Sequence, residues 1–217
     1  MSELAQLTRS ATLAADGTAA GAHAAVDALP WLASAIRVDR GADRFAMWGR
    51  STTIDENTGT AVIPQALFEE LHRRAGITAD WPVGNAGLLH CYGYLLSQEV
   101  TPYGLKRDRW TQHALARACG LPDDAFHPWH AGPTLLERAT SAASALLSAP
   151  AAGAEQSLEG RMVRVALGAA RGPAALAYAV APTPGAAPLL VTLFPVADAT
   201  TPLAAFTADP RLRWNAD

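Results

Sequence analysis

The stretch RMVRVALGAARGPAALAYAVAPTPGAAPLLVTLFPV, residues 161–196, decides the fold. It contains three short apolar segments, at 161–167, 175–180 and 189–196, separated by clusters of glycine and proline. Strands joined by such short turns leave no room for the crossover helices that parallel strands need. The stretch therefore predicts an antiparallel sheet.

The residues before this stretch predict a mixture of helices and strands. A proline at its first position and a glycine at its last delimit a helix over 64–76, and Thr134 and Glu137 have the spacing of a capping box. Residues 55–59 are typical of a hairpin turn. The expected helices are two or three within 3–37, then 64–76, about 106–119 and 133–148, and the further strands are 45–53, 61–63 and 88–97.

These elements predict an α+β fold, with a mostly antiparallel sheet of five or six strands and helices packed around it. A chain of 217 residues suits a single domain, 1–217, with a helical N-terminal segment over 1–40. Residues 148–157, SAPAAGAEQS, are typical of a linker-like loop before the C-terminal strands.

Composition argues against several classes of partner. Half of the residues are hydrophobic, 17% are charged and the net charge is −3, so neither nucleic acid nor an anionic membrane is expected to be bound. Two cysteines cannot build a disulfide framework or a four-cysteine zinc site. Because the chain shows no signal peptide and no apolar run long enough to span a membrane, we expect a cytoplasmic protein.

The common cofactor and hydrolase signatures are also absent from the sequence. WPVGNAG, residues 81–87, has neither dinucleotide-binding nor Walker spacing, and no GxSxG motif is present. His127 and His130 lack the HExxH pattern of a zinc site. The sequence therefore predicts neither a cofactor nor a metal.

One expected strand carries an imidazole and two phenols. His90, Tyr92 and Tyr94 would fall on one face, because side chains alternate along a strand, and both phenols should be buried. Trp48 and Arg50 share a face of the earlier strand in the same way. Together the two faces would line a cavity. The alternative is an exposed sheet face, where aromatic residues and arginine are also common.

The stretch TPYGLKRDRW, residues 101–110, gathers basic side chains near a helix N-terminus, where the helix dipole favours acids. Such a violation of local preference points to the binding of an anion. Lys106, Arg109 and His113 would share one helix face at spacings i, i+3 and i+7, with Arg107 beside them. The alternative is a solvated, charged helix face.

Lys106 is the one lysine among 17 lysines and arginines. A compact, titratable ammonium can perform Schiff-base or general-base chemistry that a planar guanidinium cannot. The alternative is codon usage, because the bias toward alanine, glycine, proline and arginine is typical of a GC-rich genome in which a single lysine survives by chance.

Three segments together resemble a group of actinobacterial proteins labelled amino acid deaminases, which includes the aziridine-forming cyclase of azinomycin-type pathways. They are YGYLLS (92–97), TPYGLKRDRW (101–110) and RLRWNAD (211–217). The resemblance covers residues 88–110 and the chain end, and it assigns no catalytic residue. It implies secondary metabolism, such as antibiotic biosynthesis, on an amino-acid-derived substrate that loses an anionic or amino group. It also implies a sulfotransferase as a partner enzyme.

The residues and the resemblance together predict acid–base elimination or cyclisation of a small-molecule substrate, aziridine formation included. Such a reaction requires a base, together with cations that hold the leaving anion. We expect His90 or a carboxylate as the base, with Glu137 as acid partner unless Glu137 serves only the helix cap. The expected substrate-binding residues are Trp48, Arg50, Tyr92, Tyr94, Lys106, Arg107, Arg109 and His113.

The alternative is a non-catalytic binding subunit of a biosynthetic enzyme complex, whose basic cluster docks an acidic carrier protein or a partner enzyme. The two hypotheses differ in geometry. An enzyme needs His90 and Tyr92 in a concave pocket within reach of Arg107 or Arg109, whereas a docking module presents its cations on a flat, exposed patch.

Overall fold

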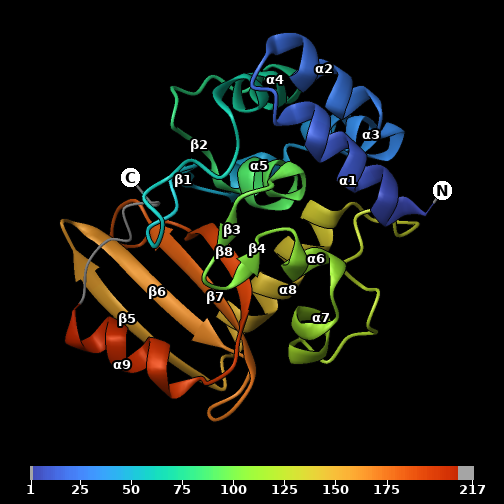
Figure 1. Ribbon diagram of the computed structural model, residues 1–217. Coiled ribbons are helices and arrows are strands. Elements are labelled where there is room, and N and C mark those ends of the chain that lie inside the picture. The colour runs from blue at the N-terminus through green and yellow to red at the C-terminus, as the bar shows by residue number, and fades with distance from the viewer. Residues whose placement is uncertain (1, 210–217) are drawn as a thin grey trace.

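The computed structural model describes residues 2–209 and confirms the α+β fold (Figure 1). The C-terminal segments form an antiparallel sheet in the order β5-β6-β7-β8. Its strands are β5 (Ala152–Leu158), β6 (Arg161–Leu167), β7 (Ala174–Ala181) and β8 (Leu189–Val196). Within residues 2–209 the sheet has four strands, not the expected five or six, because the remaining strands pair only in two-stranded ribbons.

Strand β5 corrects the linker expected over 148–157. The strand pairs with β6 along its whole length, from Ala152 opposite Leu167 to Leu158 opposite Arg161. Except for Leu158, its residues are small or polar, and alternate side chains along it are exposed. No residue of β5 is buried, so the strand has no apolar side that would distinguish it from a loop in the sequence.

Several helices match the sequence-based expectation. The N-terminal segment contains α1 (Glu3–Ala14), α2 (Ala19–Asp27) and α3 (Pro30–Gly41). Helix α4 (Gln65–Ala75) ends at Gly76, whose φ of 69° is a left-handed conformation that glycine adopts freely. Helix α8 (Leu135–Ser148) begins after Thr134, whose hydroxyl accepts the Glu137 N–H at 3.1 Å.

The strand expected over 88–97 is wrong. The segment forms helix α5 (Ala86–Cys91) and the 3-10 helix η2 (Gly93–Leu96). Asn85 caps α5, because its side-chain oxygen accepts the Leu88 N–H at 3.0 Å. An apolar run without β-branched residues fits a wholly buried helix as well as a strand, since a helix buried on all sides has no polar face.

Other expected elements are shorter or broken. The segment 45–53 consists of the 3-10 helix η1 (Arg44–Met47) and strand β1 (Arg50–Thr52), which pairs with β2 (Val83–Asn85). The strand expected over 61–63 is reduced to a single bridge between Ile54 and Ala61. A hairpin of β3 (Val100–Thr101) and β4 (Gly104–Leu105) precedes the helix expected over 106–119. That helix is split at Gln112 into α6 (Asp108–Thr111) and α7 (Ala114–Ala118).

The core is centred on α5, every residue of which is buried. Helix α4 and strand β8 both pack against α5, and α1 packs against η2 (Figure 1). Helices α7 and α8 cover the same face of the sheet, while α9 (Thr200–Ala208) packs on the opposite face through Phe206. A search of residues 2–209 finds no helix of the length and hydrophobicity that a membrane crossing requires.

Close packing around η2 makes Gly93 a test of the core. A Cβ atom at this position would lie 3.2 Å from Ile63 Cδ1 and 3.4 Å from Leu71 Cδ1. We expect Gly93→Leu to lower the free energy of unfolding by about 1–3 kcal/mol, because overpacking displaces neighbouring side chains. The matched control is Gly41→Leu, at a position where a Cβ atom meets nothing within 4 Å. Urea denaturation that gives equal losses for both variants would contradict this packing.

Candidate functional site

Six of the ten residues expected to form one site lie in two polar clusters. The His90 cluster consists of Ser51, Asp55, His90, Tyr94, Lys106, Arg109 and Thr192. The Asp39 cluster consists of Asp39, Arg44, Tyr92, Thr134 and Glu137. Between residues 2 and 209, no hydrogen bond or ion pair joins the two clusters. The expected pocket with His90 and Tyr92 on one face is therefore wrong, because alternation applies to strands and this segment is helical.

Three elements bring polar side chains to the imidazole of His90. Strand β8 supplies Thr192, and the segment leading into β1 lies beside β8, since the Gly49 N–H donates to the Leu190 carbonyl at 2.8 Å. This pairing places Ser51 next to the ring. Helix α6 is fixed to α5 by the indole of Trp110, which donates to the His90 carbonyl at 2.7 Å.

The contacts of His90 define its tautomer. Arg109 Nη1 lies 3.2 Å from Nδ1, and Ser51 Oγ lies 2.9 Å from Nε2. A guanidinium group can only donate, so Nδ1 accepts a hydrogen bond and the ring proton is on Nε2, which donates to Ser51. Thr192 Oγ1 also lies 3.1 Å from Nδ1. Both nitrogens are thus engaged, in a residue that is 4% exposed.

The surroundings of His90 keep it neutral. Burial, followed by the positive charges of Arg109 and Lys106, holds the pKa of His90 well below its ordinary value. At neutral pH the imidazole therefore has a lone pair, on Nδ1, and no charge. Chemically it can accept a proton only at Nδ1.

Arg109 is a cation held by neutral groups alone. Its Nη1 donates to His90 Nδ1 and to Thr192 Oγ1 at 3.2 Å each, and to the Leu193 carbonyl at 3.3 Å. No carboxylate of residues 2–209 pairs with it. Part of the side chain reaches solvent, yet burial lowers the pKa of Arg109. Because a guanidinium stays charged in proteins, this positive charge is left uncompensated.

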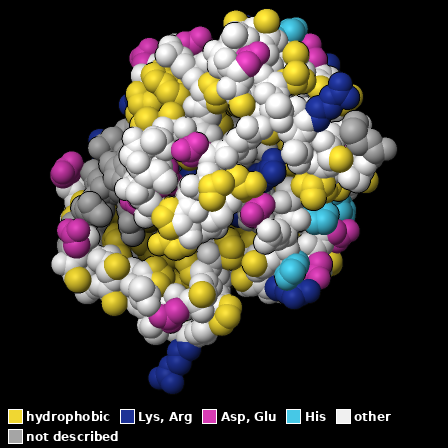
Figure 2. Space-filling view, in the orientation of Figure 1, with side chains coloured by type: hydrophobic (Ala, Val, Ile, Leu, Met, Phe, Trp, Pro, Cys, Tyr) yellow, Lys and Arg dark blue, Asp and Glu magenta, His cyan; other side chains and the backbone are white. Residues whose placement is uncertain are grey.

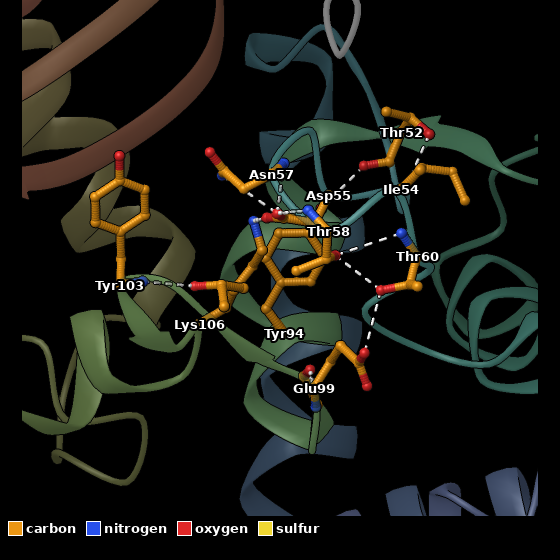
Figure 3. A network of polar contacts seen from close by, with 12 residues as sticks. Thr52, Ile54, Asp55, Asn57, Thr58, Thr60, Tyr94, Glu99, Tyr103 and Lys106 are labelled. Atoms are coloured by element: carbon orange, nitrogen blue, oxygen red, sulfur yellow. Dashed lines mark hydrogen bonds and ion pairs between the residues drawn. The ribbon is translucent and has the colours of Figure 1, made fainter.

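Lys106 has a carboxylate partner. Its Nζ lies 2.6 Å from Asp55 Oδ2 and 5.2 Å from the centre of the Tyr94 ring (Figure 3). The Tyr94 hydroxyl donates to the Thr52 carbonyl at 3.0 Å, so the ring is fixed. Asp55 also accepts the Asn57 N–H at 2.9 Å, which forms the predicted turn. The ammonium is thus enclosed between a carboxylate and an aromatic ring.

The pKa of both partners of this ion pair is lowered, which favours the charged form of Asp55 and disfavours the charged form of Lys106. Burial opposes ionisation of Asp55, but the hydrogen bonds and charge of Lys106, together with the Asn57 N–H, hold its pKa below the ordinary value. The pKa of Lys106 is also lowered, because burial and the charge of Arg109 outweigh the attraction of Asp55. Burial is the largest cause of the lowered pKa of Lys106, and the positive charge of Arg109 adds to it. The cluster holds two cations against one carboxylate.

The remaining expected site residues lie elsewhere. Trp48 is buried in the core, where its indole donates to Thr140 Oγ1 at 2.8 Å. Arg50 and His113 are exposed, because the 3-10 helix η1 and the break at Gln112 change the faces that a regular strand or helix would give. Arg107 buries Nε and Nη1 without a hydrogen-bond partner within residues 2–209. RLRWNAD (211–217) lies outside the described residues.

The Asp39 cluster ties helices together. The fully buried carboxylate of Asp39 accepts hydrogen bonds from the Tyr92 hydroxyl, from Thr134 Oγ1 at 2.6 Å and from Arg44 Nη1 at 3.2 Å. Burial raises the pKa of Asp39, and these donors oppose that shift. Glu137 pairs with Arg44 at 2.6 Å. Glu137 is therefore placed in this cluster and not beside His90, which corrects its expected position as acid partner.

Sequence reasoning missed Ser51, Asp55 and Thr192. Thr192 had a signal, because it is the one polar residue in the apolar segment LLVTLFPV. Asp55 was recognised only as a turn residue, and nothing in the local sequence of Ser51 distinguishes it from other serines.

A cavity elsewhere in the described residues lies apart from the His90 cluster. This cavity of about 270 Å³ is lined by His23, Asp27, Ala33, Arg37, Arg73 and Arg74. Arg73 and Arg74 are already paired with Glu70. On the face that Figure 2 shows, the basic side chains are dispersed among side chains of other types. No group of His, Cys, Asp or Glu suited to a metal occurs within residues 2–209.

The chain matches no protein-family model, no curated protein and no solved structure. The fold and the two clusters describe an α+β protein in which a neutral, buried histidine lies beside two cations and one carboxylate.

The Asp39 cluster gives a pH-dependent test of stability. Tyr92→Phe removes a donor to the buried carboxylate, and we expect a loss of about 1–3 kcal/mol at pH 8. The hydroxyl favours ionised Asp39, so its removal raises the pKa of Asp39 further. The loss should therefore shrink as the pH falls through that pKa.

Urea denaturation at pH 8 and pH 4.5 measures this difference. Tyr103→Phe, at a residue 85% exposed, is the matched control and should change stability little at either pH. A loss for Tyr92→Phe that is independent of pH would contradict the assigned hydrogen bond.

Proposed function

We propose that the His90 cluster binds an anionic, amino-acid-derived small molecule and removes a proton from it while an anion leaves. The reaction is an elimination or an internal cyclisation such as aziridine formation. One observation carries the proposal: Arg109, a cation without a carboxylate partner in residues 2–209, lies 3.2 Å from the unprotonated nitrogen of a neutral histidine. A fixed positive charge beside a base suits a step in which a proton is taken and negative charge develops.

The chemistry assigns a role to each group of the cluster. In an elimination, His90 Nδ1 takes a proton from carbon, the C–H electrons form a C=C bond, and the bond to the leaving group breaks with its electrons on the anion. In a cyclisation, a substrate amine forms the C–N bond, the same anion leaves, and Nδ1 takes the amine proton. Arg109 and Lys106 hold the departing anion, and Ser51 orients the ring through Nε2.

Burial of the cluster supports an internal site over a surface for docking. Ser51 and His90 are at most 4% exposed, whereas Lys106 has 19% of its side chain exposed. A ligand from solvent would therefore meet Lys106 first. A site that excludes water strengthens each electrostatic interaction within it. The setting that we propose, secondary metabolism in the actinobacterial cytoplasm, comes from the sequence and its resemblance.

A non-catalytic binding subunit is the second candidate, and the β3–β4 hairpin favours it. Val100 and Tyr103 on this hairpin are 69% and 85% exposed. The Tyr103 ring points away from Lys106, toward solvent (Figure 3). Exposed apolar and aromatic side chains are typical of protein-binding surfaces. In this alternative the hairpin docks a partner enzyme, such as a sulfotransferase, or an acidic carrier protein.

A substrate screen tests the catalytic proposal. The purified protein is incubated with O-sulfo and O-phospho derivatives of hydroxy and diamino acids, and released sulfate or phosphate is measured together with the mass of the product. We expect turnover of at least one compound, and a loss of roughly a hundredfold or more in His90→Gln, because a general base contributes that much. His130→Gln, at an exposed histidine, is the control. Unreduced turnover in His90→Gln would refute the assignment.

Lys106→Arg tests whether the cluster needs an ammonium. The variant keeps the charge, but a planar guanidinium does not fit the space between Asp55 and the Tyr94 ring in the same way. We expect the fold to be retained and turnover or anion binding to fall at least tenfold, which is about 1.4 kcal/mol. Arg117→Lys, at an exposed ion pair, is the matched control. Unchanged function in Lys106→Arg would leave codon usage as the reason for this lysine.

A further inference from the structure

The hydrogen bond between Arg109 and His90 also gives a means of regulating the base. We infer that Arg109 blocks the basic nitrogen of His90 and that an oxyanion entering the cluster draws Arg109 away, which frees Nδ1 to accept a proton. The inference rests on the proposed function, because it concerns the regulation of that same site. It makes Arg109 a switch as well as an anion-binding residue.

The block follows from the geometry of the imidazole. A neutral ring has one in-plane lone pair, and here it lies on Nδ1. Arg109 Nη1 at 3.2 Å and Thr192 Oγ1 at 3.1 Å both face this nitrogen, and Nε2 is engaged by Ser51 at 2.9 Å. In this arrangement no lone pair is left for a substrate proton. Once Arg109 has left, rotation of the Thr192 hydroxyl, which can accept as well as donate, completes the release of Nδ1.

Arg109 is the cation that an oxyanion would move. Its three hydrogen bonds, at 3.2–3.3 Å, all go to neutral acceptors. A hydrogen bond from guanidinium to an oxyanion is shorter, at about 2.7–2.9 Å, and roughly twice as strong. Lys106 is held by Asp55 at 2.6 Å and has less to gain. Competition for Arg109 therefore favours the incoming anion over His90.

The charges around His90 give the switch its direction. Two charged groups, Arg109 and Lys106, act on its imidazole. The neutral groups around it are Tyr94 on η2, Ser51 on β1 and Thr192 on β8. Asp55 pairs with Lys106 and makes no hydrogen bond with His90 itself. An oxyanion offsets the positive charge of Arg109, so the proton affinity of His90 rises when the anion binds. The base becomes effective only with the leaving group in place.

The recognised chemistry is that of a carboxylate, sulfate or phosphate, because a guanidinium fork binds each through paired oxygens. Inorganic sulfate, inorganic phosphate and acetate are therefore separate arms of one experiment. The protein is labelled with ¹⁵N in histidine and arginine side chains, and His90 is assigned by the signal lost in His90→Gln. Each anion is titrated at an ionic strength held constant with chloride, between pH 5 and pH 8.

In chloride alone we expect His90 to show the neutral tautomer with its proton on Nε2 at neutral pH. At least one of the three anions should shift the Arg109 signal and raise the proton affinity of His90 tenfold or more, with protonation at Nδ1. Arg109→Gln should raise the proton affinity without any anion and abolish the response. Arg117→Gln, which removes an exposed charge, should behave as the wild type. The titration of the wild type stands even if Arg109→Gln fails to fold.

Two results would overturn the switch, and they differ in what they say of the proposed function. If an anion shifts the Arg109 signal but leaves the tautomer and proton affinity of His90 unchanged, the switch is refuted and anion binding stands. If none of the three anions shifts either signal, the switch is refuted, and the anion site of the proposed function fails with it. Turnover in the substrate screen remains an independent measurement of the catalysis.

Discussion

A short helix that is buried on every side can hydrogen-bond its polar groups only within the protein. Helix α5 is such a helix, and its hydrogen bonds fix the segments around it. Asn85 caps its first turn, and Trp110 saturates the carbonyl of His90. The imidazole contacts Ser51 of β1, Thr192 of β8 and Arg109 of α6. Segments far apart in the sequence are thus held together by the need to leave no polar group of α5 without a partner.

The two polar clusters beside α5 show how differently buried charge can be treated. Asp39 is a buried carboxylate that receives three donors, including a guanidinium, and these donors oppose the rise in its pKa that burial causes. Arg109 is a cation for which the described chain offers only neutral acceptors. Burying a charge without a counter-charge lowers stability. A buried cation without a counter-charge is expected where a ligand supplies the negative charge.

The sequence was sufficient for elements whose signals are local. Turns rich in glycine and proline identified the antiparallel strands β6–β8, and Thr134 identified the start of α8. It was insufficient for α5, where burial on every side leaves no polar face, and for β5, where small and polar residues give no apolar alternation. Both errors concern the environment of a segment, which its own residues do not encode.

The same limit applies to the site. Local charge patterning drew attention to Lys106 and Arg109, and a lone histidine in an apolar run to His90. Their partners Ser51 and Thr192 come from segments 39 and 102 residues away from His90, and no spacing rule connects them. The misplacement of Tyr92 comes from the treatment of a helix as a strand, which put on one face side chains that point in different directions. Glu137 lies on a helix that the sequence predicted, but its partner Arg44 comes from a distant segment that no spacing rule connects with it.

The single lysine of the chain has a practical consequence. Lys106 is the only side-chain amine in the protein, and its ammonium is closed in by Asp55 and the Tyr94 ring. Amine-directed reagents therefore have one side-chain target, whose amine is available for reaction only while its ion pair with Asp55 is broken. The rate at which that amine is acylated reports how often the Lys106–Asp55 pair opens, and it is obtained without mutation or any knowledge of the ligand.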